Sequence, residues 1–137
     1  MRIFFTGNVR LSILFVYLFS FFSFGAAAVI DINHFDTLET VENITADKQV
    51  QASLKNVLGP DYAAFMGNFD VYGEPRHTAD GGLFVEGWLK DLYLENASAF
   101  VIYPDGRLSA AWVLPTASVA HYKSNTGEKR IPDALQQ

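Results

Sequence analysis

The sequence predicts an α+β fold: an antiparallel sheet of four to five strands, N-terminal helices packed on one face, and a short C-terminal helix. Apolar residues recur at helical spacing in the region before Gly59, whereas short strand-like runs separated by turn residues dominate after Phe69. No stretch of crossover-helix length lies between Phe69 and Val119, which disfavours parallel βαβ units. Helices followed by hairpin-connected strands are typical of the α+β class.

The first helix is predicted over residues 46–58, after a segment at 29–45 that shows neither helical nor strand periodicity. The stretch Thr45-Ala46-Asp47-Lys48 supplies an N-cap and an acidic first turn. Gly59-Pro60 ends the helix, because glycine accepts a left-handed cap and proline cannot continue the hydrogen-bond ladder. One face of this helix is apolar and is expected to cover the sheet through Val50, Leu54, Val57 and Leu58.

A second, shorter helix is predicted to open at Pro60-Asp61 and to close at Gly67-Asn68. After it, extended segments are predicted at 69–72, 83–86, 97–103, 107–113 and 118–122. The strongest pair is the hairpin in which 97–103 and 107–113 flank Pro104-Asp105-Gly106, because these turn residues favour chain reversal. Residues 76–81 are predicted to be a loop and 132–137 the start of a terminal helix.

The N-terminus has the layout of a secretory signal peptide. Arg2 and Arg10 precede an uncharged stretch at 11–24, and Gly25-Ala26-Ala27-Ala28 follows it. As a helix that stretch rises only about 21 Å, short of the roughly 30 Å hydrocarbon core of a membrane. The chain has no Cys for a lipid anchor. We therefore expect cleavage after Ala28, a periplasmic or secreted protein with no stable membrane anchor, and a single domain at 46–137.

The charge of the exported form favours a basic partner. Removal of Arg2 and Arg10 leaves eight basic residues against fifteen acidic ones, a net charge of −7. Nucleic acid is disfavoured because phosphate binding needs clustered Lys and Arg, and the basic residues here are scattered. An acidic surface steers a basic protein toward it. The alternative interpretation is that the charge serves solubility alone.

The sequence does not predict a catalytic, metal or cofactor site. His34, His77 and His121 are far apart in the chain, and no thiolate or Gly-x-Ser-x-Gly elbow is present. Glu86, Asp91 and Glu95 lie close together around one predicted loop, and such carboxylates can act as general acid and base. A run of this kind is more often a solvated loop, so we expect a protein that is not an enzyme.

The segment from Trp88 to Asn96 is the candidate contact surface. It joins two predicted strands and combines aromatic, apolar and charged residues, a mixture typical of the anchors of protein interfaces. The alternative is a loop folded back onto the sheet.

The order of these elements resembles the Ivy-type inhibitors of vertebrate (c-type) lysozyme and the Ivy-like exported proteins of Gram-negative bacteria. The resemblance spans residues 54–137 and is carried by Leu58-Gly59-Pro60-Asp61-Tyr62-Ala63-Ala64-Phe65, Leu83-Phe84-Val85-Glu86-Gly87, Ala97-Ser98-Ala99-Phe100 and Pro104-Asp105-Gly106-Arg107-Leu108-Ser109-Ala110-Ala111. It implies helices packed on an antiparallel sheet. It also implies an inhibitory loop between two strands, where the family carries a His flanked by two disulfide-bonded Cys and inserts that His into the lysozyme cleft.

In this chain the two cysteine positions of the loop carry Trp88 and Tyr93, and the histidine position carries Asp91. The resemblance thus implies a partner-binding set of Trp88, Lys90, Asp91, Tyr93 and Glu95. The implied partner is a basic lysozyme or a lytic transglycosylase. Two alternatives stay open, namely an Ivy-like envelope protein with another partner, and a small hydrolase that uses the carboxylates of the loop.

Overall fold

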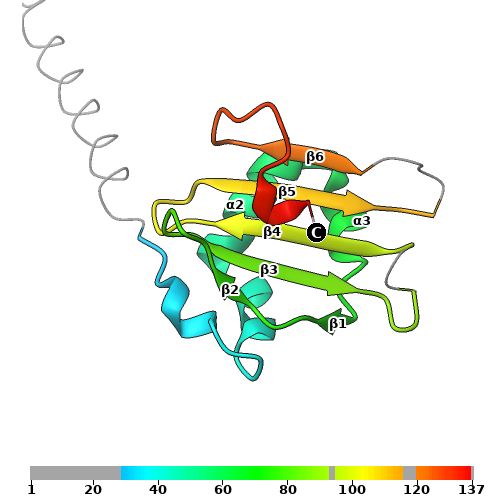
Figure 1. Cartoon of the computed structure of the whole chain (residues 1–137), viewed down its shortest axis with the longest axis horizontal. Coiled ribbons are helices and arrows are strands. Elements are labelled where there is room, and N and C mark those ends of the chain that lie inside the picture. Colours follow the sequence, from blue (N-terminus) through cyan, green and yellow to red (C-terminus); the bar gives the residue numbers. More distant parts are fainter. Residues whose placement is uncertain (1–28, 93–94, 116–119, 137) are drawn as a thin grey trace, which may run out of the picture.

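The computed structural model describes residues 29–92, 95–115 and 120–136. Within these ranges the strands form one antiparallel sheet in the order β1-β3-β4-β5-β6, with β2 paired to β3 beside β1. The helices lie behind this sheet (Figure 1). The elements are α2 (Lys48–Leu58), α3 (Tyr62–Met66), β1 (Val71–Tyr72), β2 (Arg76–His77), β3 (Leu83–Trp88), β4 (Ala97–Ile102), β5 (Leu108–Val113) and β6 (His121–Ser124). This architecture confirms the predicted α+β class.

Short 3-10 turns complete the described chain: η2 (Ile32–Phe35), η3 (Val41–Ala46), η4 (Gly59–Asp61) and η5 (Asp133–Leu135). Two of them, η2 and η3, fall in the segment that was expected to be irregular. That segment also belongs to the core, because Val41 and Ile44 are fully buried. The predicted C-terminal helix is only the 3-10 turn η5, and Pro132 occupies its N-cap position.

The first helix begins two residues later than predicted. The Asp47 carboxylate accepts hydrogen bonds from the backbone N–H groups of Gln49 and Val50, each at 3.0 Å, and therefore caps α2. The Thr45 hydroxyl, expected as part of the cap, instead shares a 2.6 Å hydrogen bond with the Tyr72 hydroxyl. The capping residue of α2 is therefore Asp47, and Thr45 belongs to the preceding turn η3.

The strands also differ from the prediction at their ends. The predicted 97–113 hairpin is confirmed, with Ala97 opposite Val113 and Ile102 opposite Leu108. Residues Arg76–His77 were expected in a loop but form β2 against β3, and β1 is shorter than predicted. The last predicted strand, 118–122, lies partly outside the described residues, and β6 extends beyond it to Ser124.

β3 runs two residues further than predicted because Gly87 gives an aromatic ring room to pack. The Phe69 ring lies directly on the Gly87 backbone, and an added Cβ at Gly87 would stand 2.2 Å from the Phe69 Cδ1 atom. Any larger residue would push this ring out. With the ring in place, β3 pairs with β4 as far as Trp88, opposite Ala97.

The core lies between the helices and one face of the sheet. Phe65 of α3 is fully buried and its ring meets those of Phe69, Phe100 and Trp112 at centroid distances of 5.5, 6.2 and 5.8 Å. From α2, the fully buried side chains are Val50, Leu54 and Leu58. Of the predicted helix face, Val57 is only partly buried and packs at the edge of this cluster.

A buried polar side chain joins the helical layer to the sheet. Asn68, 2% exposed, donates from its amide to the Ser98 hydroxyl at 3.0 Å, and Ser98 donates to the Phe65 carbonyl at 2.7 Å. The same amide lies 3.3 Å from the Ala97 carbonyl and 3.4 Å from that of Val113. Because buried polar groups left without partners are costly, this network fixes the end of α3 against β4 and β5.

Leu54→Ala is expected to lower the free energy of unfolding by about 2–5 kcal/mol, because it removes a fully buried side chain and leaves a cavity. Urea titration of the two proteins measures the difference. Gln49→Ala, at an exposed position of the same helix, is the control and should change stability by no more than about 0.5 kcal/mol. A loss below that size for Leu54→Ala would show that α2 is not part of the core.

Candidate functional site

Backbone hydrogen bonds hold the turn that joins β3 to β4. The N–H of Leu89 donates to the Asn96 carbonyl at 3.1 Å and so extends the ladder past the strands. The N–H of Leu92 donates to the Leu89 carbonyl at 2.9 Å. The Asp70 carboxylate, which precedes β1, accepts from the N–H of Lys90 at 3.2 Å. Hydrogen bonds therefore restrain the first half of the turn, both within the turn and to the residue that precedes β1.

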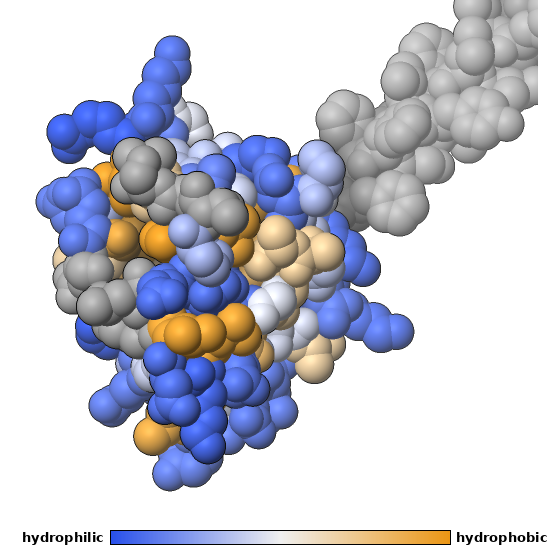
Figure 2. Space-filling view, turned by 90° about the vertical axis from the view of Figure 1, so that its right-hand side faces the viewer, coloured by the Kyte–Doolittle hydropathy of each residue, from blue (hydrophilic) through white to orange (hydrophobic). Residues whose placement is uncertain are grey.

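Asp91 occupies the tip of this turn. It is the only described residue other than glycine with a positive φ, at 67°, and aspartate is one of the few residues that enters this region readily. Its side chain is exposed, and that of Leu92 beside it is 40% exposed. The turn thus presents a carboxylate next to an apolar side chain. Figure 2 views this end of the sheet and shows hydrophobic surface between hydrophilic residues.

The structure separates the predicted partner-binding residues into two groups. Lys90, Asp91 and Glu95 are exposed and lie on the turn. Trp88 is the last residue of β3, pairs with Val71 and Ala97, and is half-buried. It therefore forms the base of the turn rather than its tip. Tyr93, and with it the expected aromatic contact between Trp88 and Tyr93, lies outside the described residues.

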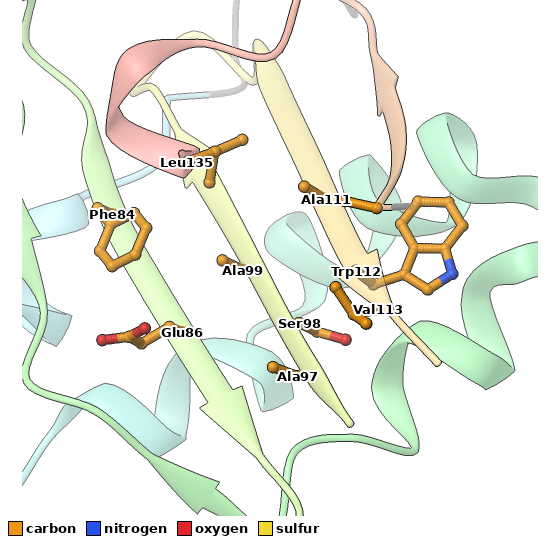
Figure 3. Close-up of a pocket in the computed structure, with 10 residues that line it drawn as sticks. Phe84, Glu86, Ala97, Ser98, Ala99, Ala111, Trp112, Val113 and Leu135 are labelled. Carbon is orange, nitrogen blue, oxygen red and sulfur yellow. The ribbon is translucent and has the colours of Figure 1, made fainter. Parts of the chain in front are cut away.

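The face of the sheet opposite the helices carries a shallow depression that the sequence analysis did not identify. The turn η5 lies over this face in front of β4 and β5 (Figure 1). Beside it the cavity has a volume of about 190 Å³. In Figure 3 the side chains of Ala97 and Ala99 on β4 and Ala111 on β5 lie between Phe84 and Glu86 on one side and Val113 on the other, with Leu135 of η5 nearby.

The signal for this depression is the alternation of small residues with core residues. Ala97 and Ala99 alternate with Ser98 and Phe100, which are buried on the helix side. In a strand, successive side chains point to opposite faces. Ala97 and Ala99 therefore both point to the face opposite the helices, where their short side chains leave a depression. Alanine has no strong preference for strands or for binding sites, and the sequence of one strand does not show which strand lies beside it. The depression could therefore not be predicted from this alternation.

Glu86 is the one acidic side chain in the lining of this depression. It is half-buried, and burial raises the pKa of its carboxyl group, while the positive charge of Arg76 acts in the opposite direction. Its Oε2 atom lies beside Gly73, where an added Cβ would stand 2.8 Å away. Arg76 itself lies over the Phe84 ring, at 4.3 Å from the centroid. Among the residues that the structure describes, none donates a hydrogen bond to the Glu86 carboxylate.

A second hollow, at the other end of the sheet, contains polar groups that already bond to one another. The Tyr103 hydroxyl donates to Asp80 at 2.7 Å, and the Arg107 guanidinium lies 4.3 Å from the centre of the Tyr103 ring. Burial, and then the bond to Asp80, raise the pKa of Tyr103 to about 12. Hydrogen bonds from Thr78 and Tyr103 lower the pKa of Asp80. Tyr103 and Arg107 flank the turn of the β4–β5 hairpin, so these contacts hold that turn.

The three histidines have separate neighbours. His34 lies 3.2 Å from Asp31, His77 lies 3.0 Å from Asp36, and His121 stacks on Trp112. In the described ranges no three His, Cys, Asp or Glu residues are grouped as metal binding would require. Of the carboxylates considered for catalysis, Glu86 faces the depression from β3, while Asp91 and Glu95 belong to the turn.

Comparisons with protein-family models, with curated proteins and with solved structures found no match for this chain. The similarity to the Ivy-type family therefore stays a prediction from the sequence. Among the helices in the described part of the chain, none is long and apolar enough to cross a membrane.

Glu86→Gln is expected to stabilise the protein at neutral pH. Folding raises the pKa of the Glu86 carboxyl group, which means that the ionised form destabilises the folded protein. This loss of stability is absent below the unfolded-state pKa, where the group is protonated in both states, and it develops as the pH rises through the folded-state pKa. Urea titrations of the variant and the parent at about pH 3.5 and pH 7 bracket that window. The variant's advantage should be larger at pH 7. An equal difference at both pH values would contradict the burial of the charge.

Proposed function

We propose that this chain is an exported binding protein that contacts a basic protein partner through the turn between β3 and β4. The observation that carries the proposal is the exposed Asp91 carboxylate at the tip of a turn held by backbone hydrogen bonds, with the exposed Leu92 beside it. The partner indicated by the sequence resemblance is a peptidoglycan-cleaving hydrolase of the c-type lysozyme kind, which the protein inhibits by occupying its cleft.

The restraints on the turn support this proposal. Ordering a flexible loop on binding costs free energy, and a loop already fixed in its bound shape avoids that cost. The Ivy-type loop is closed by a disulfide, and this chain has no Cys. Here the bond between Leu89 and Asn96 and the bond from Lys90 to Asp70 restrain the base of the turn instead.

Charge supports the same partner. The exported form has a calculated net charge of −7 after loss of Arg2 and Arg10, and opposite net charges accelerate association and fix its orientation. An exposed carboxylate at the turn tip makes the attraction to a basic partner sensitive to salt, because the Debye length is only about 8 Å at physiological ionic strength.

Asp91→Asn is expected to weaken binding to a c-type lysozyme by about two- to fivefold, the range for one exposed ion pair. Asparagine tolerates the same positive φ, so the variant changes the charge without straining the turn. Isothermal titration calorimetry at low and at physiological salt measures both affinities, and the difference between parent and variant should shrink as salt rises.

The matched control is Glu39→Gln. It removes the same charge from an exposed position between η2 and η3. It should leave the affinity unchanged. Equal weakening by both variants would assign the effect to net charge, and an absence of heat and inhibition in either buffer would remove lysozyme as the partner.

Export has its own test. The proposed signal peptide predicts that protein recovered from the periplasm of an expressing Gram-negative bacterium begins at Val29. Intact-mass measurement distinguishes this form from one that retains residues 1–28. Recovery of the longer form from the periplasm would contradict cleavage after Ala28.

A further inference from the structure

A second, smaller group of buried apolar residues lies on the sheet face opposite the helices. Phe84, Val101 and Ala111 are 2%, 2% and 7% exposed, yet none of them belongs to the hydrophobic core between the helices and the sheet. Phe100 and Ala110, which precede two of them in sequence, do belong to that core, and successive side chains of a strand point to opposite faces. Something other than the helices therefore covers this face.

The C-terminal segment 129–136 is the part of the described chain that lies over this face. Its turn η5 lies in front of the sheet and contacts β4 (Figure 1). Leu135 lines the depression together with Phe84 and Ala111 (Figure 3). Four side chains of the segment are apolar and half-buried, namely those of Ile131, Pro132, Ala134 and Leu135. The segment thus places apolar side chains over an apolar surface.

Within the described residues, side-chain packing alone holds this segment to the sheet. No hydrogen bond or ion pair joins residues 129–136 to another described part of the chain, and bonds such as that from the Gln136 amide to the Ile131 carbonyl, at 2.7 Å, stay within the segment. The packing also leaves space, because the depression of about 190 Å³ lies beside Leu135 and a hollow of about 360 Å³ beside Ile131. Segments with so few restraints open at low cost in free energy.

The chain just before the segment is anchored and supplies a hinge. The Asn125 side chain accepts from the N–H of Leu108 at 2.7 Å, and the N–H of Asn125 donates to the Leu108 carbonyl at 3.0 Å. Gly127 follows, with a φ of 85° and open space around its Cα atom. The Glu128 carbonyl accepts one long bond, at 3.5 Å, from the Tyr122 hydroxyl. Rotation of the backbone after Asn125 can therefore move the segment while β6 stays paired.

We propose that segment 129–136 is a displaceable cover, and that the apolar face beneath it is a second contact surface for the protein partner. The inference rests on the proposed function in taking that partner to sit on the β3–β4 turn. Ala97 lines the depression and pairs with Trp88 at the base of this turn, so a partner on the turn reaches this face next. The occupant is an aliphatic side chain of the partner, because Leu135 shows what the surface accepts.

The cover is an autoinhibitory contact. In the open state Phe84, Val101 and Ala111 meet water, which is unfavourable, so the closed state is the main one in the free protein. A partner side chain that packs on the same surface binds the open state alone and shifts the equilibrium toward it. Replacing Leu135 by a polar residue weakens the closed state without touching the β3–β4 turn.

Thiol accessibility tests the opening without any partner, because the chain has no Cys of its own. Ala111→Cys places a thiol beneath the cover, and Ala110→Cys, one residue earlier, places one in the core on the helix side. The rate of reaction with the aromatic disulfide reagent DTNB is measured for each variant of the full-length sequence. Ala111→Cys should react at least about tenfold faster, because local opening needs less free energy than unfolding of the core. Adding Leu135→Ser should speed Ala111→Cys by about fivefold and leave Ala110→Cys unchanged.

A synthetic peptide of residues 129–137 tests the contact surface. It is titrated into the Leu135→Ser protein, which is labelled at alanine methyl groups for NMR. The peptide should shift the signals of Ala99 and Ala111 on the open face and leave that of Ala52, exposed on α2, in place. The same peptide with serine in place of its leucine should bind at least about fivefold more weakly.

Three results would overturn the inference. They are equal reaction rates for the two thiols, an Ala111→Cys rate that Leu135→Ser leaves unchanged, and a peptide that fails to bind or binds equally well without its leucine. Neither experiment contains a lysozyme, so failure here leaves the role of Asp91 to be judged by the calorimetry alone.

Discussion

The packing of Phe65 between the helices and the sheet is the contact on which the rest of this structure depends. Its fully buried ring meets three other aromatic rings, contributed by the segment after α3 and by β4 and β5. The short helix α3 could not persist alone, because isolated helices of this length are unstable in water. The aromatic cluster therefore both holds α3 in place and sets the side of the sheet that becomes the core.

This one-sided core has two consequences for function. The described helices cover one face of the sheet, so the other face is left to the outward side chains of the strands, among them the alanines of β4 and β5 and the Phe84 ring, and to the turn η5 (Figure 1). The network of Asn68 and the packing of Phe69 on Gly87 then fix β3 and β4 at the end where their turn begins. The same packing therefore gives the β3–β4 turn a rigid base and an exposed acidic tip, and it leaves a shallow depression on the open face of the sheet.

Local chemistry explains what could be predicted from the sequence. The hairpin around Pro104-Asp105-Gly106 depends on turn residues within the segment itself, and α2 depends on an apolar repeat within eleven residues. Contacts between distant segments decided the rest. β2 exists because Leu83 and Phe84 pair with it. Asp47 caps α2, while the Thr45 hydroxyl is bonded to Tyr72 of the distant strand β1.

The candidate site follows the same division. Exposure of Lys90, Asp91 and Glu95 could be expected from a charged turn, but the positive φ of Asp91 depends on how the turn closes. Trp88 was expected in the loop because the predicted strand ended at Glu86, whereas β3 continues to Trp88, which pairs with Ala97 of β4 and Val71 of β1. The depression was missed because its floor is assembled from β4 and β5 and its carboxylate from β3.

The central claim is that partner contact occurs at the β3–β4 turn and on the adjoining open face. Cross-saturation NMR tests it most directly, with unlabelled c-type lysozyme irradiated and the methyl groups of this protein observed. Saturation should reach Leu92 and Ala97 and should not reach Ala52 or Ala63 on the helices. Saturation of the helix methyl groups in place of the turn and open face, or no transfer at all, would contradict the account.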